Sequence, residues 1–207
     1  AQDPHKRRGY DEAWLQKTLP KTYSYLKRFE HRLLERKDRG TMGLIDKGAP
    51  FYSMFSVSDY TIAPYKVVWG RMASVMEASV ISSIDGKAVI PQETVTLIPA
   101  TQAEEAHYVC AALNSSPFNF AVQSYSQKGG KSFGTPGILE DAYLPRFEAG
   151  NEVHLHLANC SQRAHDSAGD TEKVKGIEVE IDRLAAKLWG LTDGELREIQ
   201  ESLAELG

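Results

Sequence analysis

Residues 103–139 read AEEAHYVCAALNSSPFNFAVQSYSQKGGKSFGTPGIL. Four apolar residues recur there at spacings of three and four: Ala106, Val109, Cys110 and Leu113. This spacing brings them to one face of a helix. Pro117 ends that helix, because proline has no amide hydrogen and disfavours helical geometry at the residue before it. A second apolar stretch, 118–122, follows the break. The region therefore predicts an amphipathic helix, a break and a short apolar segment.

The end of this region has the composition of a functional loop. Residues 124–137 contain four glycines, three serines, two lysines and no acidic residue. No hydrophobic period continues through them, and long biased loops in compact domains are usually functional or disordered. Hydroxyls, amides and ammonium groups suit phosphates and base edges. We therefore predict a loop that reads nucleic acid and is supported by the preceding helix. Residues 124–135 are called the recognition loop below.

Several residues of the recognition loop are candidates for DNA contact. They are Ser126, Gln127, Lys128, Gly129, Gly130, Lys131, Ser132 and Thr135. The two adjacent glycines allow backbone geometries closed to other residues, so their amides can approach a groove or a phosphate closely. The lysines can reach phosphates, and the glutamine can bond an adenine through both atoms of its amide. Phe133 can anchor the loop to the core or press against the DNA, and we expect the anchor.

Composition and charge are compatible with nucleic-acid binding without proving it. The 207 residues are 42% hydrophobic and 25% charged, as in an ordinary soluble protein. A chain of this length can bury one core, or one core plus a small helical appendage. The formal net charge is -4. Residues 170–207 carry 5 basic and 10 acidic side chains, so the rest of the chain has 19 basic and 18 acidic ones. Because phosphate attraction is screened over about 10 Å, local patches matter more than the total.

The chain has no membrane or secretion signal in its sequence. No apolar run reaches the length of a membrane span, and the N-terminus lacks the apolar core of a signal peptide. Cys110 and Cys160 are far apart and lie in apolar helical patterns, so we expect no disulfide and a reducing, cytoplasmic setting. The chain begins with Ala-Gln-Asp-Pro and no Met. We expect it to be part of a longer protein.

The middle of the chain has the pattern of strands. Stretches rich in β-branched and aromatic residues predict strands at 51–58, 65–72, 79–84, 87–90 and 94–98. Asp85-Gly86 is a strong signal for a two-residue hairpin turn, and 138–147 predicts a further extended segment. Helical patterns occupy both ends of the chain. Without repeated βαβ units, the expected fold is α+β, with a mixed, largely antiparallel sheet, flanking helices and a C-terminal helical hairpin.

These patterns divide the chain into three expected parts. They are an N-terminal helical segment at 1–40, an α+β core at 41–150 and C-terminal helices at 151–207. The core should include Val67, Val68, Val95, Leu97, Val109 and Leu113.

The strand at 65–71 combines charged and apolar residues. Alternation brings Lys66 and Val68 to one face, and Val67, Trp69 and Arg71 to the other. We expect Trp69 in the core. Lys66 is a candidate phosphate contact, with an ordinary solvated lysine as the alternative.

The residues that suggest a metal or a catalytic site do not form a known motif. Four residues of metal-ligating types lie close in sequence: His154, His156, Cys160 and His165. However, Cys160 belongs to an apolar stripe, and neither Cys-x-x-Cys nor His-Glu-x-x-His occurs. The run 128–132 lacks the glycine spacing of a phosphate-binding loop. We therefore assign no catalytic, cofactor-binding or metal-ligating residue to this chain.

Five strings, in their order along the chain, carry a resemblance to a known family. They are Ala63-Pro-Tyr-Lys-Val-Val-Trp69, the helix running into Leu113-Asn-Ser-Ser-Pro117, the Gly/Ser/Lys loop, Ile138 through Leu144-Pro145, and Glu180-Ile-Asp-Arg-Leu-Ala-Ala-Lys-Leu-Trp-Gly-Leu-Thr-Asp193. Together they resemble the C-terminal target-recognition (specificity) domain of adenine-specific DNA methyltransferases. Within these methyltransferases, the chain resembles the TaqI-like class and the fused restriction–modification enzymes related to it. The resemblance covers about residues 20–206.

The resemblance implies a function in DNA recognition. The partners would be double-stranded DNA and an upstream methyltransferase domain of the same chain, with the target adenine flipped out for methylation. The family's Asn-Pro-Pro-Tyr/Phe motif and glycine-rich S-adenosylmethionine motif are absent from these 207 residues. We therefore expect the cofactor and the catalysis in a separate domain, and no enzymatic activity of this chain alone. Two alternatives stay open: a specificity module for a separate methylase, and a protein- or RNA-binding module without an enzymatic role.

Overall fold

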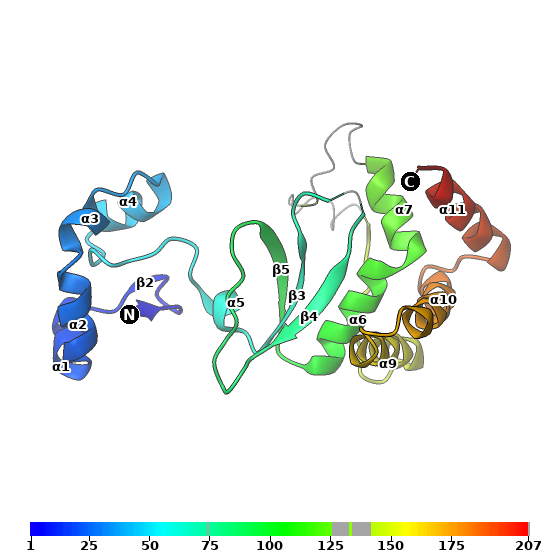
Figure 1. The fold of residues 1–207 in the computed structure, drawn as a ribbon, viewed down its shortest axis with the longest axis horizontal. Coiled ribbons are helices and arrows are strands. Elements are labelled where there is room, and N and C mark those ends of the chain that lie inside the picture. Colours follow the sequence, from blue (N-terminus) through cyan, green and yellow to red (C-terminus); the bar gives the residue numbers. More distant parts are fainter. Residues whose placement is uncertain (74, 126–132, 134–141, 207) are drawn as a thin grey trace. The chain divides into compact units, whose positions relative to one another are not determined.

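The chain folds into two compact units, Ala1–Ile62 and Ala63–Gly207 (Figure 1). The structure is a computed structural model that describes residues 1–73, 75–125, 133 and 142–206. The boundary after Ile62 differs from the expected divisions after residues 40 and 150. Residues 41–62 belong with the N-terminal helices, and the C-terminal helices belong with the sheet. No helix in the described part of the chain is long and apolar enough to cross a membrane.

The first unit is built from short helices around a small core. Its elements are β1 (Gln2–Asp3), β2 (Arg8–Gly9), α1 (Glu12–Thr18), α2 (Pro20–Lys27), α3 (Glu30–Leu34), α4 (Arg39–Asp46) and α5 (Asp59–Ile62). Leu15 is fully buried, and Phe51 and Tyr52 pack beside it with their rings edge to face. A side chain also bonds the backbone beside this core: Arg36 Nη2 donates a hydrogen bond to the Phe51 carbonyl at 2.7 Å.

The predicted strand at 51–58 is wrong. Residues 51–58 form turns and bends instead of a ladder. A ladder needs free backbone carbonyls, and in this stretch side chains from elsewhere in the unit occupy two of them. Besides the bond from Arg36 to Phe51, Gln2 Nε2 donates to the Tyr52 carbonyl at 2.7 Å. Of the residues that suggested a strand, Phe51 and Tyr52 are buried against Leu15, whereas Met54 and Phe55 are exposed.

The sheet of the second unit has three antiparallel strands. They are β3 (Tyr65–Gly70), β4 (Ala78–Ser82) and β5 (Val95–Ala100), in the order β4-β3-β5. Val67 pairs with Val80 on one side and Ile98 on the other, so three β-branched side chains share one face. These strands confirm three of the predicted ones and the largely antiparallel sheet.

The turn at Asp85-Gly86 forms as predicted. Asp85 has φ 50° and Gly86 has φ 71°, the left-handed conformations that a two-residue hairpin turn of this kind requires. Ile84 and Lys87 form the bridge that closes it. The predicted strand at 87–90 is wrong beyond this bridge, because residues 88–90 join no ladder.

Helices cover one face of the sheet. They are α6 (Ala103–Asn114), α7 (Ser116–Tyr125), α9 (Glu152–Asp166), α10 (Thr171–Leu188) and α11 (Asp193–Leu206). Figure 1 shows the strands on one side of α6 and the C-terminal helices on its other side. The predicted helix, its end near Asn114 and the C-terminal helical hairpin are confirmed. The apolar stretch after Pro117 is itself a helix, since proline is well tolerated in a first turn. The predicted α+β class is confirmed.

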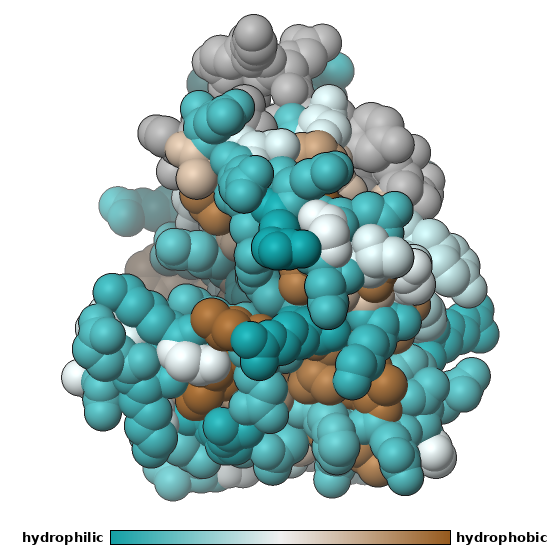
Figure 2. All heavy atoms as spheres, turned by 90° about the vertical axis from the view of Figure 1, so that its right-hand side faces the viewer, coloured by the Kyte–Doolittle hydropathy of each residue, from teal (hydrophilic) through white to brown (hydrophobic). Residues whose placement is uncertain are grey.

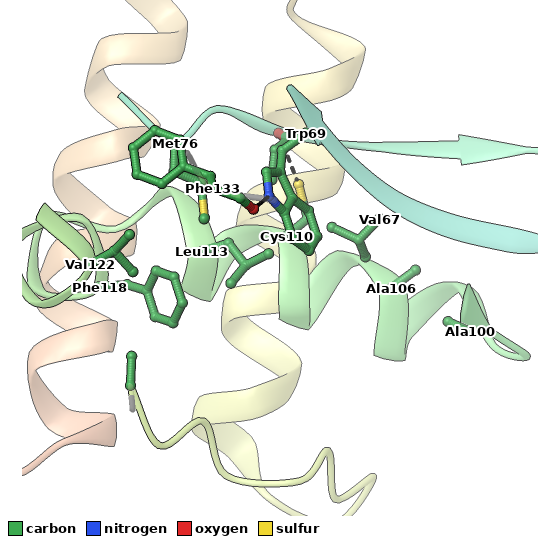
Figure 3. Packing of buried hydrophobic residues seen from close by; sticks show 12 residues of the cluster. Val67, Trp69, Met76, Ala100, Ala106, Cys110, Leu113, Phe118, Val122 and Phe133 are labelled. Carbon is green, nitrogen blue, oxygen red and sulfur yellow. Dashed lines mark hydrogen bonds between the residues drawn. The ribbon is translucent and has the colours of Figure 1, made fainter. Parts of the chain in front are cut away.

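The main core lies between the sheet and the helices α6 and α7. Val67 and Trp69 from β3 meet Cys110 and Leu113 from α6 and Phe118 from α7 (Figure 3). A second core on the opposite side of α6 joins it to the C-terminal helices. Its buried residues are Tyr108, Ala111, Leu157, Ala158, Cys160, Ile177 and Ile181. Helix α6 is therefore covered on two sides, which explains why most of its residues are buried.

Two of the six predicted core residues are fully buried, Val67 and Leu113. The other four are only half-buried: Val68, Val95, Leu97 and Val109. The strand register explains two of these cases. Val68 pairs with Leu97 on the face of β3 that is opposite to Val67, away from α6.

The predicted extended segment at 138–147 does not add a strand in its described part. Residues 142–147 are irregular, and 138–141 lie outside the described residues. Side chains again occupy the carbonyls. The indole Nε1 of Trp189 donates to Tyr143 at 2.7 Å, and the hydroxyl of Tyr108 donates to Pro145 at 2.9 Å.

The break between α6 and α7 binds the outer edge of β4. Asn114 accepts a hydrogen bond from the Ala78 amide at 2.7 Å and donates one to the Ala78 carbonyl at 2.8 Å. Asn119 bonds the amide and the carbonyl of Met76 in the same way, at 3.2 and 3.4 Å. A neighbouring strand would make the same pair of bonds to an edge residue. The two amide side chains thus take the place of a fourth strand.

The same break is joined to the C-terminal hairpin. The amide and the hydroxyl of Ser116 donate to the carboxylate of Asp182 on α10, at 2.7 and 2.6 Å. Gln200 on α11 donates to the same carboxylate at 2.7 Å. One short stretch of chain therefore links the sheet, α10 and α11.

We predict that Asn114→Ala destabilises the protein. The substitution removes two hydrogen bonds. It leaves the Ala78 amide without its side-chain acceptor, while the Ala78 carbonyl keeps the Cys110 thiol at 3.3 Å. The loss should cost about 1–3 kcal/mol. Urea denaturation followed by tryptophan fluorescence measures this loss. Asn159→Ala is the matched control, because Asn159 lies on the exposed face of α9. Equal stability of the two variants would contradict the role of Asn114.

Candidate nucleic-acid interface

Most of the recognition loop lies outside the described residues. This holds for the predicted DNA-binding residues from Ser126 to Ser132 and for Thr135, whose roles stay predictions. Ser124 and Tyr125 are the last residues of α7 and not the start of a loop.

Phe133 anchors the recognition loop, as predicted. Its side chain is only 1% exposed and belongs to the main core. Its amide donates to the carbonyl of Arg71 at 2.8 Å, and its carbonyl accepts from the indole Nε1 of Trp69 at 3.0 Å. Figure 3 shows this bond between the two aromatic residues. The loop is therefore fixed at one residue to the end of β3.

The two predictions for β3 have different outcomes. Trp69 is buried in the core, as predicted. Both interpretations of Lys66, a phosphate contact or a solvated lysine, required an exposed ammonium group, and the structure corrects this. The Lys66 side chain is 2% exposed, and its Nζ donates to the carbonyl of Ala63 at 2.8 Å. Burial lowers the pKa of this lysine. A phosphate contact would have to replace the bond to Ala63, so we leave Lys66 out of the interface proposed below.

Arg71 is the exposed cation at the base of the loop. Its amide donates to the carbonyl of Thr94 at 3.0 Å, and its own carbonyl receives the Phe133 amide. Its guanidinium is exposed and bonds the carbonyl of Glu93 through Nη1 at 3.1 Å. The backbone of Arg71 is thus held on both sides. A guanidinium presents several N–H donors in a planar fork, which matches phosphates and guanine edges.

The surface beside this guanidinium is hollowed. Arg71, Met72, Glu93 and Thr94 line a cavity of about 460 Å³, and Met72 is 71% exposed. The guanidinium can contact phosphates or base edges, and the protruding methionine can contact bases. From the sequence, Arg71 is expected only to share a strand face with Trp69 and is not among the predicted DNA-binding residues. Its position directly after the buried strand was the signal that could have identified it.

Two histidines of α9, His154 and His165, accept hydrogen bonds within the fold, and His156 is exposed. His154 packs between the rings of Tyr108 and Phe147 and accepts the amide of Glu148 at 3.0 Å. Burial lowers the pKa of His154 and raises that of the Cys160 thiol to about 11. Within the part of the chain that the structure describes, no group of three or more His, Cys, Asp or Glu residues could hold a metal ion.

His165 and His107 form a buried polar contact beside β4. His165 accepts the Val80 amide through Nε2 at 2.9 Å, and its Nδ1 lies 2.8 Å from the Ser161 carbonyl. These two bonds together require the proton on Nδ1. His107 lies 3.0 Å from the Ser161 hydroxyl, and the two imidazole rings meet edge to face. Burial, and then the neighbouring His165, lower the pKa of His107.

The fold of this chain is known from another protein. No protein-family model matches the chain. The fold is similar to that of the type IIL restriction–modification enzyme MmeI, whose structure was determined in complex with DNA. The TM-score is 0.58 with 9% sequence identity, over 96% of this chain and 28% of the MmeI chain.

A sequence relative points to the same group of enzymes. The chain is 32% identical over 97 residues to the type II methyltransferase M.NspV of Nostoc sp. (strain ATCC 29411 / PCC 7524). This match covers 47% of the chain and 19% of M.NspV. The expected resemblance to restriction–modification enzymes is thus confirmed, and the assignment to the TaqI-like class stays a prediction. The chain corresponds to less than a third of either protein.

We predict that the histidine contact makes stability dependent on pH. A histidine in the unfolded chain binds a proton near its ordinary pKa of 6.5, whereas folding lowers the pKa of His107. The unfolded state therefore binds more protons as the pH falls below that value, and the free energy of unfolding decreases from about pH 7 to about pH 5. Nearby Asp166 and Glu104 partly oppose the shift.

Urea denaturation at a series of pH values tests this prediction. His107→Gln removes the titrating group, so its stability should depend less on pH than that of the unmodified chain. His154 remains in both proteins and contributes equally to both curves. The same pH dependence in both proteins would show that His107 is not responsible.

Proposed function

We propose that this chain is the DNA sequence-recognition part of a larger restriction–modification enzyme with DNA methyltransferase activity. The observation that carries this proposal is the likeness of fold to MmeI over 96% of the chain, because the MmeI structure contains DNA. The partial identity to a type II methyltransferase supports the same class of parent protein.

The geometry at the end of β3 supports a role in reading DNA. Phe133 fixes the recognition loop beside the exposed guanidinium of Arg71. Phosphate contacts set the position of a protein on DNA, and contacts to base edges set the sequence. Arg71 supplies a positioning contact from a rigid strand end. The recognition loop supplies the small hydroxyls, the Gln127 amide and the lysines that read neighbouring bases and phosphates.

Methyl transfer belongs to another part of the parent protein in this proposal. Every strand ladder among the described residues is antiparallel, whereas nucleotide cofactors commonly bind at a glycine-rich turn of a parallel sheet. We therefore assign S-adenosylmethionine to another domain of the parent protein. An upstream methyltransferase domain would hold the cofactor and receive a flipped adenine. We expect the enzyme in the cytoplasm, where its DNA substrate is.

We predict that Arg71→Ala weakens binding to duplexes of any sequence. Loss of one phosphate contact should also reduce the slope of log affinity against log salt by about one unit. Fluorescence anisotropy with short labelled duplexes at several salt concentrations measures both effects. Arg163→Ala is the control, since Arg163 is an exposed arginine on α9 that pairs with Glu180 at 2.8 Å.

The same titrations separate the roles within the recognition loop. Lys128→Ala or Lys131→Ala should act like Arg71→Ala, on all sequences alike. Gln127→Ala should instead relax the choice of one base pair, at a cost of roughly 1–3 kcal/mol for the correct site. If replacement of residues 126–132 by a neutral linker changes neither affinity nor sequence preference, the loop is not the reader.

We also predict that the purified chain transfers no methyl group. Incubation with radiolabelled S-adenosylmethionine and an adenine-containing duplex should leave the DNA unlabelled, because the sequence lacks the Asn-Pro-Pro-Tyr/Phe motif and the glycine-rich motif of the methyltransferases that it resembles. A methyltransferase domain added in trans, or the intact parent protein, is the positive control. Labelled DNA from the chain alone would overturn this division of functions.

A further inference from the structure

The two last helices form a groove outside the proposed DNA-reading site. Residues of α10 and α11 line it, and its volume is about 580 Å³. On α10, Val179, Arg183 and Lys187 follow one another at intervals of four and therefore share one face of the helix. On α11, Leu196 and Arg197 line the same groove from the other side.

The rim of the groove is basic in a strongly acidic part of the chain. Three of the 5 basic residues in 170–207 line it: Arg183, Lys187 and Arg197. All three are exposed, and none forms an ion pair with a carboxylate among the described residues. Other cations nearby are paired, since Lys175 bonds Glu172 at 3.1 Å. The single acidic residue in the lining is Asp193.

Four of the nine residues that line the same groove are apolar, and the two buried ones form its floor. Ala186 and Leu196 are buried, Leu191 is half-buried, and Val179 is 49% exposed. Figure 2 shows the side of the molecule that carries α10 and α11, where hydrophobic patches lie among hydrophilic residues. An apolar floor with a cationic rim is the complement of an amphipathic segment with an apolar stripe and acidic flanks.

We propose that the groove between α10 and α11 binds an acidic amphipathic helix of a protein partner. The apolar stripe of that helix covers Val179 and Leu191, and its carboxylates pair with Arg183, Lys187 and Arg197. A DNA backbone would use the cations but would gain nothing from the apolar floor, since its phosphates and sugars are polar. The combination of the two therefore favours a protein segment.

The test uses a labelled helical peptide of 18 residues with leucines at positions i, i+3, i+4 and i+7 and glutamates beside them. The full chain should bind this peptide in a salt-dependent way. The double variant Arg183→Glu/Lys187→Glu should bind it at least about tenfold more weakly, because like charges then face each other. The matched control is Lys173→Glu/Lys175→Glu, which makes the same change of charge on exposed residues of α10 outside the groove. Val179→Asp tests the apolar lining independently and should weaken binding as well.

The proposal is overturned by any of three results. The glutamate peptide and a counterpart with lysines in place of the glutamates bind equally. The groove and control variants lose the same affinity. The groove variant loses affinity for a short labelled duplex and keeps its affinity for the peptide, which would make the groove a DNA-backbone contact. Circular dichroism of each variant confirms that the helices are intact.

Discussion

The outer edge of β4 is bonded by side chains and not by a strand, and the arrangement of the second unit depends on this constraint. Asn119 bonds Met76, Asn114 bonds Ala78, and His165 bonds Val80. These partners come from α7, α6 and α9. Unpaired edge groups that are buried cost free energy, so each of the three helices is fixed in both position and rotation relative to the sheet. Packing of the core alone would leave more freedom, because apolar contacts have little directionality.

The position of the candidate interface follows from this arrangement. Helix α7 continues directly from the break that bonds the edge of β4, and it ends at Tyr125, where the recognition loop follows. The chain is tied back to β3 at Phe133. Helix α7, through Phe118 and Val122, and Phe133 therefore belong to one core. Trp69 contributes an aromatic ring to this core and the N–H that bonds the Phe133 carbonyl. A single residue thus links the stability of the sheet to the location of the loop.

Local patterns predicted the elements whose structure is decided locally. The spacing around Cys110, the Asp85-Gly86 pair and the alternation through Trp69 gave the helix, the turn and β3. Phe133 could be predicted as an anchor because it is the aromatic residue of a polar loop. The errors have the opposite origin. Residues 51–58 and 142–147 look extended, but side chains distant in sequence take their carbonyls. Likewise, Lys66 bonds a carbonyl that no periodic pattern reveals.

The two edges of the sheet also bear on how this unit behaves when it meets copies of itself. Open edges invite other chains to add strands, which is a common route to aggregation. On the outer edge of β4, the amide and the carbonyl of Ala78 already form hydrogen bonds with Asn114. At the opposite edge, β5 contains Pro99, which has no amide hydrogen to donate to a strand of another chain. Both edges of this sheet therefore resist the addition of a strand from another chain. The unit should be able to fold during synthesis, or persist after cleavage, without forming intermolecular sheets.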